Sequence, residues 1–269
     1  MVAPIPRERM FHLRKVIYSV LIVIFLAIFA FSAWQLYQIF DEYKAGTNTY
    51  AALEQYVSVP DSASTEPATG ETGQAGGEKK TDNTVWPVVD FEALQEINPD
   101  IVGWIYIEDT EINYPIVQGD DNTYYLKHLF DGTANSSGSI FLDAYVEPDF
   151  SGQNSILHGH HMKNGSMFGG LKYYKEQSYY DEHSVALLLT PEANYKVLLF
   201  SGYVVSTAAD AWDTEFTDSQ YAKWLKEISG KSCFESDIVP ETTDRILTLS
   251  TCSYEFNDAR FVLHGIITQ

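Results

Sequence analysis

The feature that most constrains this chain is a run of 25 residues without a charged side chain, Val16–Phe40. A run of this length can cross the hydrocarbon layer of a bilayer as one tilted helix. Charged residues flank it on both sides: Arg7, Arg9, Arg14 and Lys15 before it, Asp41 and Glu42 after it. By the positive-inside rule, we expect residues 1–15 in the cytoplasm, a single-pass transmembrane anchor at 16–40 and the rest of the chain outside the cell.

A cleaved signal peptide is the alternative interpretation of this run. Its apolar core would normally span about 7–15 residues and end at a small-residue cleavage site. Here the apolar run is longer and continues through Trp34, Leu36 and Tyr37, and such aromatic residues suit the outer interface of a membrane. The pattern therefore favours an uncleaved anchor, and cleavage after Ser32 or Ala33 is the other reading.

The chain beyond Lys15 is strongly acidic. It holds 13 Lys and Arg residues against 36 Asp and Glu residues, a net charge of −23. Nucleic-acid binding needs clustered cations, so this composition argues against a nucleic-acid partner. We expect the charge to serve solubility, with recruitment of a basic substrate region as the alternative.

Between the anchor and the folded domain, we expect a stalk and a flexible linker at 41–85. Residues 43–56 can continue the anchor helix into a short stalk. Residues 58–84 are rich in Ser, Thr, Gly, Pro and charged residues and contain almost no apolar side chain, so they cannot form a core. The extracellular folded domain is then expected at 86–269, where no second break of this kind occurs.

Strand patterns dominate this domain. A short helix is expected first at 91–97, with Asp90 as its N-cap and Asn98-Pro99 as its stop. Runs of β-branched or aromatic residues between turn residues predict eight strands, at 102–107, 112–117, 139–142, 155–157, 185–189, 195–205, 245–251 and 261–267. Helical inserts are expected at 123–129, 166–174 and 218–229, the last capped by Asp218 and ended by Gly230. The pattern predicts a mainly β fold, a small eight-stranded barrel with an N-terminal helix and helical inserts.

One segment near the C-terminus, Thr248-Leu249-Ser250-Thr251-Cys252, places a thiol at the end of a predicted strand. Arg260 opens the next predicted strand, so we expect a fixed cation beside that thiol. A nearby cation favours the thiolate, the nucleophilic form of cysteine, and a planar guanidinium can stabilise a carbonyl oxygen that becomes negative. A Cys233–Cys252 disulfide is the alternative in an oxidising compartment. We favour a free Cys252, because a disulfide would consume the reactive thiol.

His160 is the candidate acid/base. It lies in Gly159-His160-His161-Met162, a turn-like exit from the strand predicted at 155–157. An imidazole can titrate near neutral pH and protonate a departing amine. His158 and His161 are expected to be packing or hydrogen-bonding neighbours, and His264 to be structural.

Three closely spaced histidines, His158, His160 and His161, also fit a zinc site as an alternative interpretation. The protein would then be a non-catalytic metal module tethered to a membrane. The chain contains no HExxH or CxxC spacing, so we expect neither a metal nor another cofactor.

A Cys, His and Arg trio does not fix the reaction by itself. Cys252 would attack a peptide carbonyl to form a thioester while His160 protonates the leaving amine. If water resolves the thioester, the enzyme is a membrane-anchored thiol protease. If a second amine resolves it, the enzyme is a transpeptidase.

Taken in order along the chain, these segments resemble the sortase family, and class B sortases most closely. The likeness covers essentially all of 91–267. Besides Thr248–Cys252 and Arg260, the matching blocks are 98–105, 114–118, 121–126, 138–143 and 159–168. The resemblance implies an eight-stranded sortase β-barrel outside the membrane of a Gram-positive-type cell.

The resemblance also implies an activity and partners. Cys252 would cleave a sorting motif near the C-terminus of a secreted protein, and the acyl chain would pass to an amine of a lipid-linked cell-wall precursor, which attaches the protein to peptidoglycan. Pilin polymerisation is the alternative, since class B includes both activities. The sorting motif, the acceptor amine, the client protein and the oligomeric state are left open by the sequence.

The residue roles implied by the resemblance centre on Cys252, His160 and Arg260 as the catalytic residues. Arg260 and the backbone N–H of Ser253 would together steady the oxyanion. Ser250 and Thr251 would line the substrate groove, and the helix expected at 218–229 would wall it. The roles of the two other histidines in this region stay open.

Overall fold

The computed structural model of the protein describes residues 7–59 and 84–269. The chain divides into two compact units, Met1–Ala45 and Gly46–Gln269, which are considered separately. Most of the linker expected at 58–84 lies outside the described residues, as do residues 1–6 of the expected cytoplasmic segment.

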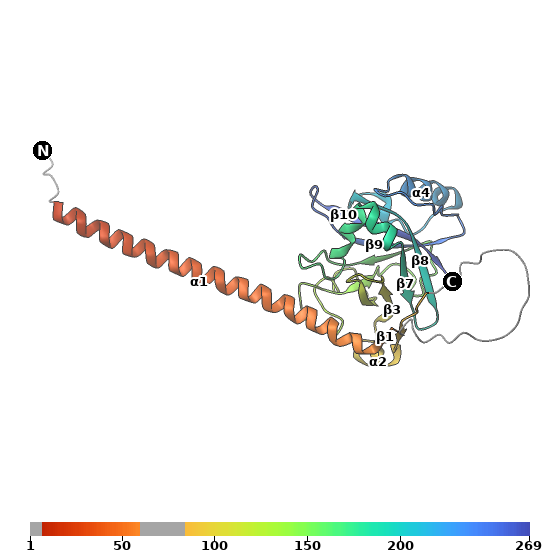
Figure 1. Ribbon diagram of the computed structural model, residues 1–269, viewed down its shortest axis with the longest axis horizontal. Coiled ribbons are helices and arrows are strands. Elements are labelled where there is room, and N and C mark those ends of the chain that lie inside the picture. Colours follow the sequence, from red (N-terminus) through yellow and green to blue (C-terminus); the bar gives the residue numbers. More distant parts are fainter. Residues whose placement is uncertain (1–6, 60–83) are drawn as a thin grey trace, which may run out of the picture. The chain divides into compact units, whose positions relative to one another are not determined.

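The described part of the first unit is one helix. Helix α1 spans Arg7–Leu53 and therefore continues into the second unit (Figure 1). Its side chains at 17–40 are mostly apolar and are exposed, an arrangement that is unfavourable in water. Within the described residues, α1 holds one span that is long and apolar enough to cross a membrane. This helix can therefore serve as the anchor expected at 16–40.

The second unit includes the end of α1, well before the start expected at residue 86. Tyr50 and Leu53 in the last turns of α1 are buried. The Tyr50 hydroxyl donates a hydrogen bond to the Gly138 carbonyl oxygen at 2.6 Å, and its ring meets the Tyr114 ring edge-on, with 5.2 Å between the centroids. The C-terminal part of the expected stalk is thus packed into the folded unit. The sequence did not predict this packing, because the apolar residues of the expected stalk are isolated and form no periodic pattern.

A two-stranded ladder brings together the two ends that flank residues 60–83. After the short 3₁₀ helix η1 (Glu54–Tyr56), strand β1 (Val57–Ser58) pairs antiparallel with β2 (Val88–Val89). The Asp90 N–H also donates to the Tyr56 carbonyl oxygen at 2.9 Å. The chain on both sides of the Ser- and Gly-rich segment therefore belongs to the folded unit, and α1 enters that unit without passing through this segment.

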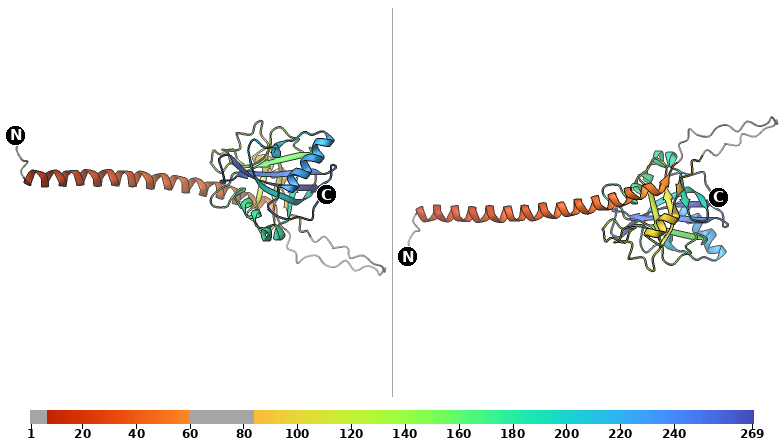
Figure 2. Two further views of the ribbon diagram at one scale, coloured as in Figure 1. Left: turned by 90° about the horizontal axis from the view of Figure 1, so that it is seen from above. Right: turned by 90° about the horizontal axis from the view of Figure 1, so that it is seen from below.

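Eight further strands close into the predicted β-barrel (Figures 1 and 2). Their bounds are β3 Ile101–Tyr106, β4 Asn113–Val117, β5 Ile140–Leu142, β6 Asn154–His158, β7 Val185–Leu189, β8 Asn194–Ser206, β9 Arg245–Cys252 and β10 Ala259–Thr268. Each strand begins and ends within two residues of its expected range. The order around the barrel is β10-β8-β7-β3-β4-β5-β6-β9, and pairing of β9 with β10 closes it.

Two predicted helices of the second unit are confirmed. Helix α2 (Phe91–Ile97) begins as expected, with the Asp90 side chain accepting from the Ala93 N–H at 3.1 Å. Helix α4 (Asp218–Gly230) matches the expected insert at 218–229, but its N-cap is Thr217 rather than Asp218, because Thr217 and Gln220 form a capping box. Its apolar face is buried against β8 and β10 in a cluster that includes Tyr221, Trp224, Leu225, Ile228, Phe200, Val262 and Ile266.

The other two expected inserts differ from the prediction. Residues 123–129 form bends and turns, because the Asp121 carboxylate accepts hydrogen bonds from the N–H groups of Thr123 (2.7 Å) and Tyr124 (2.9 Å) and reverses the chain locally. The insert expected at 166–174 is a 3₁₀ helix, η2 (Gly169–Lys175), followed by helix α3 (Gln177–Glu182). A Gly pair at the start of η2 weakens an α-helix there.

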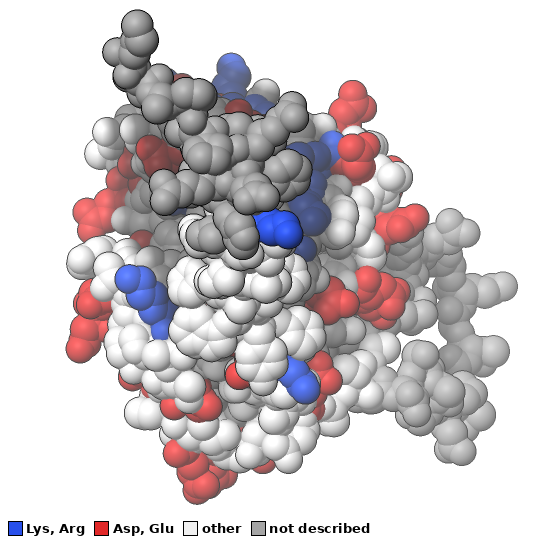
Figure 3. Space-filling model, turned by 90° about the vertical axis from the view of Figure 1, so that its left-hand side faces the viewer, with Lys and Arg blue, Asp and Glu red and all other residues white. Residues whose placement is uncertain are grey.

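The surface of the structure reflects the composition. Figure 3 shows one face, on which Asp and Glu side chains are spread widely and Lys and Arg are fewer. This distribution agrees with the net charge of −23 beyond Lys15. It fits an expectation of solubility rather than of nucleic-acid binding.

The burial of Tyr50 within the second unit leads to a stability prediction for Tyr50→Phe. This change removes the hydroxyl that bonds the buried Gly138 carbonyl, so the free energy of unfolding of the second unit should fall by about 1–3 kcal/mol. Urea unfolding of the full chain in detergent micelles, followed by tryptophan fluorescence, measures it. Tyr145→Phe is the matched control, because Tyr145 is 80% exposed. Unchanged stability in Tyr50→Phe would show that the end of α1 does not contribute to the folded unit.

Candidate active site

Strands β6 and β9 place two expected site residues at one edge of the barrel. They lie side by side and run in the same direction, so both end on the same side. The last pair that they form joins His158 with Ser250. His160 and Cys252 each follow this last pair by two residues, so both lie at the same end of the two strands.

Further contacts hold this edge in place. The Gly159 N–H donates to the Ser250 carbonyl oxygen at 3.1 Å, and the Thr251 hydroxyl donates to the Gly159 carbonyl oxygen at 2.8 Å. On the other side of β9, Arg260 of β10 lies directly opposite Cys252 in the antiparallel register. The cation expected beside the thiol is thus on the neighbouring strand.

A groove of about 300 Å³ opens at this edge. Cys252, His160 and Arg260 all line it, and so do Ser250 and Thr251. The other lining residues are Asn122, Leu126, Phe141, His158, Gly159, Thr207 and Trp212. Hollows beside the end of α1 and beside α3 are as large or larger, but none of the expected catalytic residues lines them. Chemistry, rather than size, therefore singles out this groove.

The groove wall differs from the expectation at α4. No residue of α4 lines the groove. The lining instead includes Trp212 of the 3₁₀ helix η3 (Asp210–Trp212), which precedes α4 in the chain. The role expected for the helix therefore belongs to the segment that leads into it, because the apolar face of α4 is already used in packing against the barrel.

Both cysteines are free thiols, so the alternative Cys233–Cys252 disulfide is not formed. Cys252 is half-buried in the groove. Cys233 lies after α4, with its sulfur 3.6 Å from the Tyr174 carbonyl oxygen. Desolvation raises the pKa of the Cys233 thiol, which keeps this sulfur in its less nucleophilic form.

His160 and His161 contact different groups. Nε2 of His160 lies 2.7 Å from the Leu126 carbonyl oxygen, and Nδ1 of His161 lies 2.8 Å from the Cys252 carbonyl oxygen. A carbonyl oxygen only accepts, so each of these nitrogens carries a proton and donates. His160 lines the groove, whereas His161 supports the backbone of the thiol residue and packs against Tyr254, with 5.2 Å between the ring centroids.

Ser253 does not take the position expected for it. Its backbone N–H donates to the Ala259 carbonyl oxygen at 2.9 Å, because hydrogen bonding between β9 and β10 continues past the pair of Cys252 with Arg260. That N–H is therefore not free to meet an oxyanion. The Ser253 hydroxyl donates to the Glu255 carboxylate at 2.5 Å, and Ser253 does not line the groove.

An ion pair anchors the loop that joins Cys252 to Arg260. The Lys175 ammonium at the end of η2 donates to the Glu255 carboxylate in this loop. Hydrogen bonds from Lys175 and from the Ser253 hydroxyl lower the pKa of Glu255 to about 2. The carboxylate thus stays ionised at neutral pH and holds the loop against η2.

His264 is fully buried on β10 next to Trp224 of α4, with 5.8 Å between the ring centroids, and it does not line the groove. Its Nδ1 lies 2.8 Å from the Thr248 hydroxyl and its Nε2 lies 3.2 Å from the Tyr203 hydroxyl. The Thr248 hydroxyl donates onward to the Asn154 side chain at 2.6 Å. Desolvation by complete burial lowers the pKa of His264 to about 3, which fits the structural role expected for it.

The described residues offer no site for the zinc ion considered as an alternative. Across 7–59 and 84–269, no three His, Cys, Asp or Glu side chains are grouped to hold a metal. The rings of His158, His160 and His161 each bond a different group instead of facing a common point.

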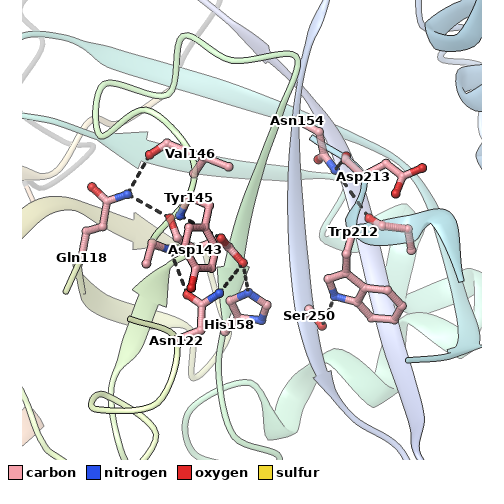
Figure 4. Close-up of polar contacts among 12 residues, drawn as sticks. Gln118, Asn122, Asp143, Tyr145, Val146, Asn154, His158, Trp212, Asp213 and Ser250 are labelled. Carbon is pink, nitrogen blue, oxygen red and sulfur yellow. Dashed lines mark hydrogen bonds and ion pairs between the residues drawn. The ribbon is translucent and has the colours of Figure 1, made fainter. Parts of the chain in front are cut away.

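Three residues in or beside the groove were not singled out from the sequence. Asn122 and Asp143 lie in segments that carry the family resemblance, but nothing in the pattern distinguished their side chains from ordinary turn residues. Nε2 of His158 lies 3.0 Å from Oδ2 of Asp143, and Asn122 donates to the same carboxylate at 2.8 Å (Figure 4). Trp212 carried no signal, because an isolated Trp in a loop fits many roles.

Comparisons with known proteins agree with this fold. The sortase domain family matches residues 105–267. Sortase B of Listeria monocytogenes serovar 1/2a is 32% identical over 248 residues, which cover 91% of this chain and 94% of that protein. A Bacillus anthracis sortase B structure in complex with AAEK1 is 31% identical with a TM-score of 0.70, covering 86% of this chain and 100% of that one. A Staphylococcus aureus sortase B–substrate complex is 37% identical with a TM-score of 0.64, covering 66% and 84%.

The buried His264 predicts how stability depends on pH. Its folded-state pKa of about 3 lies below the ordinary 6.5, so between these values the unfolded chain binds a proton that the folded barrel does not. The free energy of unfolding should therefore fall as the pH drops from about 6.5 toward 3, by up to about 1.4 kcal/mol per pH unit from this group. Urea unfolding at several pH values should give a shallower slope for His264→Gln than for the wild type. Equal slopes would contradict this assignment.

Proposed function

Because this chain belongs to the sortase family of cysteine transpeptidases, we propose that it cleaves a sorting motif near the C-terminus of secreted proteins and transfers the acyl chain to an amine of a cell-wall precursor. The observation that carries the proposal is the meeting of Cys252, His160 and Arg260 in one groove. The reaction joins two peptide substrates through a covalent enzyme intermediate.

In the first half-reaction, the Cys252 thiolate attacks the carbonyl carbon of the scissile peptide bond. A C–S bond forms, the C–N bond breaks, and His160 supplies a proton to the leaving amine. In the second half-reaction, an acceptor amine attacks the thioester and gives its proton back to His160. The C–S bond breaks as the new C–N bond forms. The Cys252 thiolate is regenerated, and the enzyme returns to its starting state.

Arg260 is suited to stabilise the transition state. The carbonyl oxygen becomes negative when the thiolate attacks, and a guanidinium on the adjacent strand can donate to it. Nη1 of Arg260 donates to the Ala259 carbonyl oxygen at 3.0 Å, which steadies the side chain while other donors of the fork remain. With the Ser253 N–H engaged in the strand ladder, Arg260 is the main oxyanion donor in this proposal.

The partners in this proposal are secreted proteins with a C-terminal sorting signal and a lipid-linked peptidoglycan precursor. The Staphylococcus aureus relative is in complex with a substrate, and a further sortase B structure, 38% identical with a TM-score of 0.63, is complexed with triglycine, a peptide with a free amine. The apolar span of α1 supports a single-pass anchor. The basic residues that precede it favour a cytoplasmic N-terminus and an extracellular barrel.

Dependence on an amine tests transfer against hydrolysis. The full chain in detergent micelles is incubated with a pentapeptide library, with and without triglycine, and the products are identified by mass spectrometry. We expect products in which the N-terminal fragment is joined to triglycine, and no such product from Cys252→Ala. Hydrolysis at the same rate with and without triglycine, and no ligated product, would instead indicate a thiol protease.

The two neighbouring histidines provide a matched test of the acid/base assignment. Cys252→Ala should abolish peptide cleavage, and His160→Ala should reduce kcat by about 10²–10⁴-fold, because the leaving amine loses its proton donor. His161→Ala should largely spare activity, because His161 lies outside the groove. Steady-state kinetics on one cleaved pentapeptide measure all three variants. Equal losses at both histidines would contradict the assignment.

Arg260→Lys tests the oxyanion role separately from charge. A lysine keeps the positive charge but lacks the planar fork, so kcat/KM should fall by about 10²–10³-fold. The same peptide assay measures the loss, and thermal unfolding checks that the variant is folded. Turnover near that of the wild type would refute the oxyanion role of Arg260.

A further inference from the structure

The loop that carries His160 closes on itself before η2 begins. We call residues 160–168 the histidine loop. The Phe168 N–H donates to the His160 carbonyl oxygen at 3.0 Å, and His161 and Met167 pair as an isolated antiparallel bridge. The two ends of the histidine loop therefore lie side by side, so the position of Met167 helps to set the position of His160.

Met167 adopts a backbone conformation that is unfavourable for its residue type. Its φ angle is 56°, in the left-handed region, where the Cβ of a residue other than glycine lies too close to a backbone carbonyl oxygen. Such a conformation persists only where the surrounding structure holds it. Met167 is buried, so contacts within the protein must hold this conformation.

The Tyr114 hydroxyl supplies one of these contacts. It accepts a hydrogen bond from the Met167 N–H at 3.0 Å. Tyr114 lies on β4, where its pairing with Ile105 of β3 fixes its place in the barrel. Desolvation by burial raises the pKa of Tyr114 to about 12, so the hydroxyl stays neutral near pH 7.

The last turns of α1 hold the Tyr114 ring in turn. The Tyr50 ring meets it edge-on, with 5.2 Å between the centroids. The Tyr50 hydroxyl donates to the Gly138 carbonyl oxygen at 2.6 Å, and both tyrosines are buried. The acceptor of the Met167 N–H is therefore itself fixed from two sides, by the barrel sheet and by α1.

Packing alone does not hold Met167 on this side of the histidine loop. A hollow of about 320 Å³ lies beside the last turns of α1, and Tyr50, Tyr114, Ser166 and Met167 all line it. The chain at Met167 thus has space into which it can relax. The hydrogen bond to Tyr114 is what restrains it there.

The other support of His160 is its ring contact. Nε2 of His160 donates to the Leu126 carbonyl oxygen at 2.7 Å. The chain beside Leu126 is held by Ser139, whose N–H donates to the Tyr125 carbonyl oxygen at 2.9 Å. With the ring acceptor fixed in this way, the far end of the histidine loop decides whether the backbone of His160 stays in register with it.

From these contacts we propose that Tyr114 is a positioning residue for the proposed reaction: its hydroxyl fixes the far end of the histidine loop and so keeps His160 in place to protonate the leaving amine. The inference rests on the proposed function, since it concerns the proton that His160 supplies. Tyr114 does not line the groove and acts on the reaction only through His160.

The test separates protonation of the leaving group from the rest of the reaction. A pentapeptide that the full chain cleaves is compared with its thioester analogue, in which sulfur replaces the nitrogen of the scissile bond. Both substrates form the same thioester on Cys252. The C–N bond of the peptide breaks with a proton from His160, whereas the C–S bond of the analogue breaks to release a thiolate. A thiol is a far stronger acid than an amine, so the thiolate leaves without that proton.

Tyr114→Phe keeps the buried ring but leaves the Met167 N–H without its acceptor. We expect kcat/KM to fall by about 5- to 150-fold on the peptide and by less than about threefold on the thioester. Tyr106→Phe is the matched control, because Tyr106 lines the same hollow from β3 and its hydroxyl bonds no residue of the histidine loop within the described chain. It should change neither rate.

Two results overturn the inference. Peptide cleavage by Tyr114→Phe at the wild-type rate shows that the hydroxyl is not needed. Equal losses on peptide and thioester, or an unfolded variant in thermal unfolding, assign Tyr114 to folding alone. His160→Ala tests the proposed function on the same two substrates. If it loses both equally, or if the wild type cleaves neither, the proposed function itself fails, so the two failures are distinguishable.

Discussion

The parallel pairing of β6 with β9 is the constraint on which the site depends. Parallel neighbours end on the same side of a sheet, so His160 and Cys252, 92 positions apart in the chain, leave the barrel together after the pair of His158 with Ser250. The antiparallel register of β9 with β10 then sets Arg260 opposite Cys252. A slip of one residue in either pairing would turn the side chains to the other face of the sheet. The barrel core prevents this, because those strands bury their apolar residues.

Polar contacts between side chains hold the loops beside the groove, which the strand pairing does not fix. The pair of Lys175 with Glu255 anchors the loop between β9 and β10, and the pair of Asp143 with His158 anchors the turn after β5. Both are partly exposed, so their contribution to stability is small. Their effect is geometric, because they hold the loop after β9 and the turn after β5 in fixed positions beside the groove.

Much of this arrangement could be predicted from the sequence, because it follows from local patterns. Runs of β-branched and aromatic residues bounded by turn residues predicted the eight strands, and the segment ending in Cys252 with Arg260 on the next strand predicted the thiol and its cation. Three features could not be predicted in this way. The burial of Tyr50 depends on its hydrogen bond to Gly138, 88 positions away in the chain. The hydrogen bond of the Ser253 N–H to Ala259 depends on how far the pairing of β9 with β10 continues. The place of Trp212 in the groove lining depends on which segment of the chain reaches the groove. Each is a tertiary contact with no local signature.

The most direct measurement is intact-protein mass spectrometry of the full chain, quenched in acid during turnover of a cleaved peptide without an acceptor amine. A thioester on Cys252 predicts a mass increase equal to the N-terminal peptide fragment, which maps to Cys252 by proteolysis and disappears with hydroxylamine. An adduct that maps to Cys233, or turnover that persists after Cys252 has been alkylated, would contradict a reaction centred on this groove.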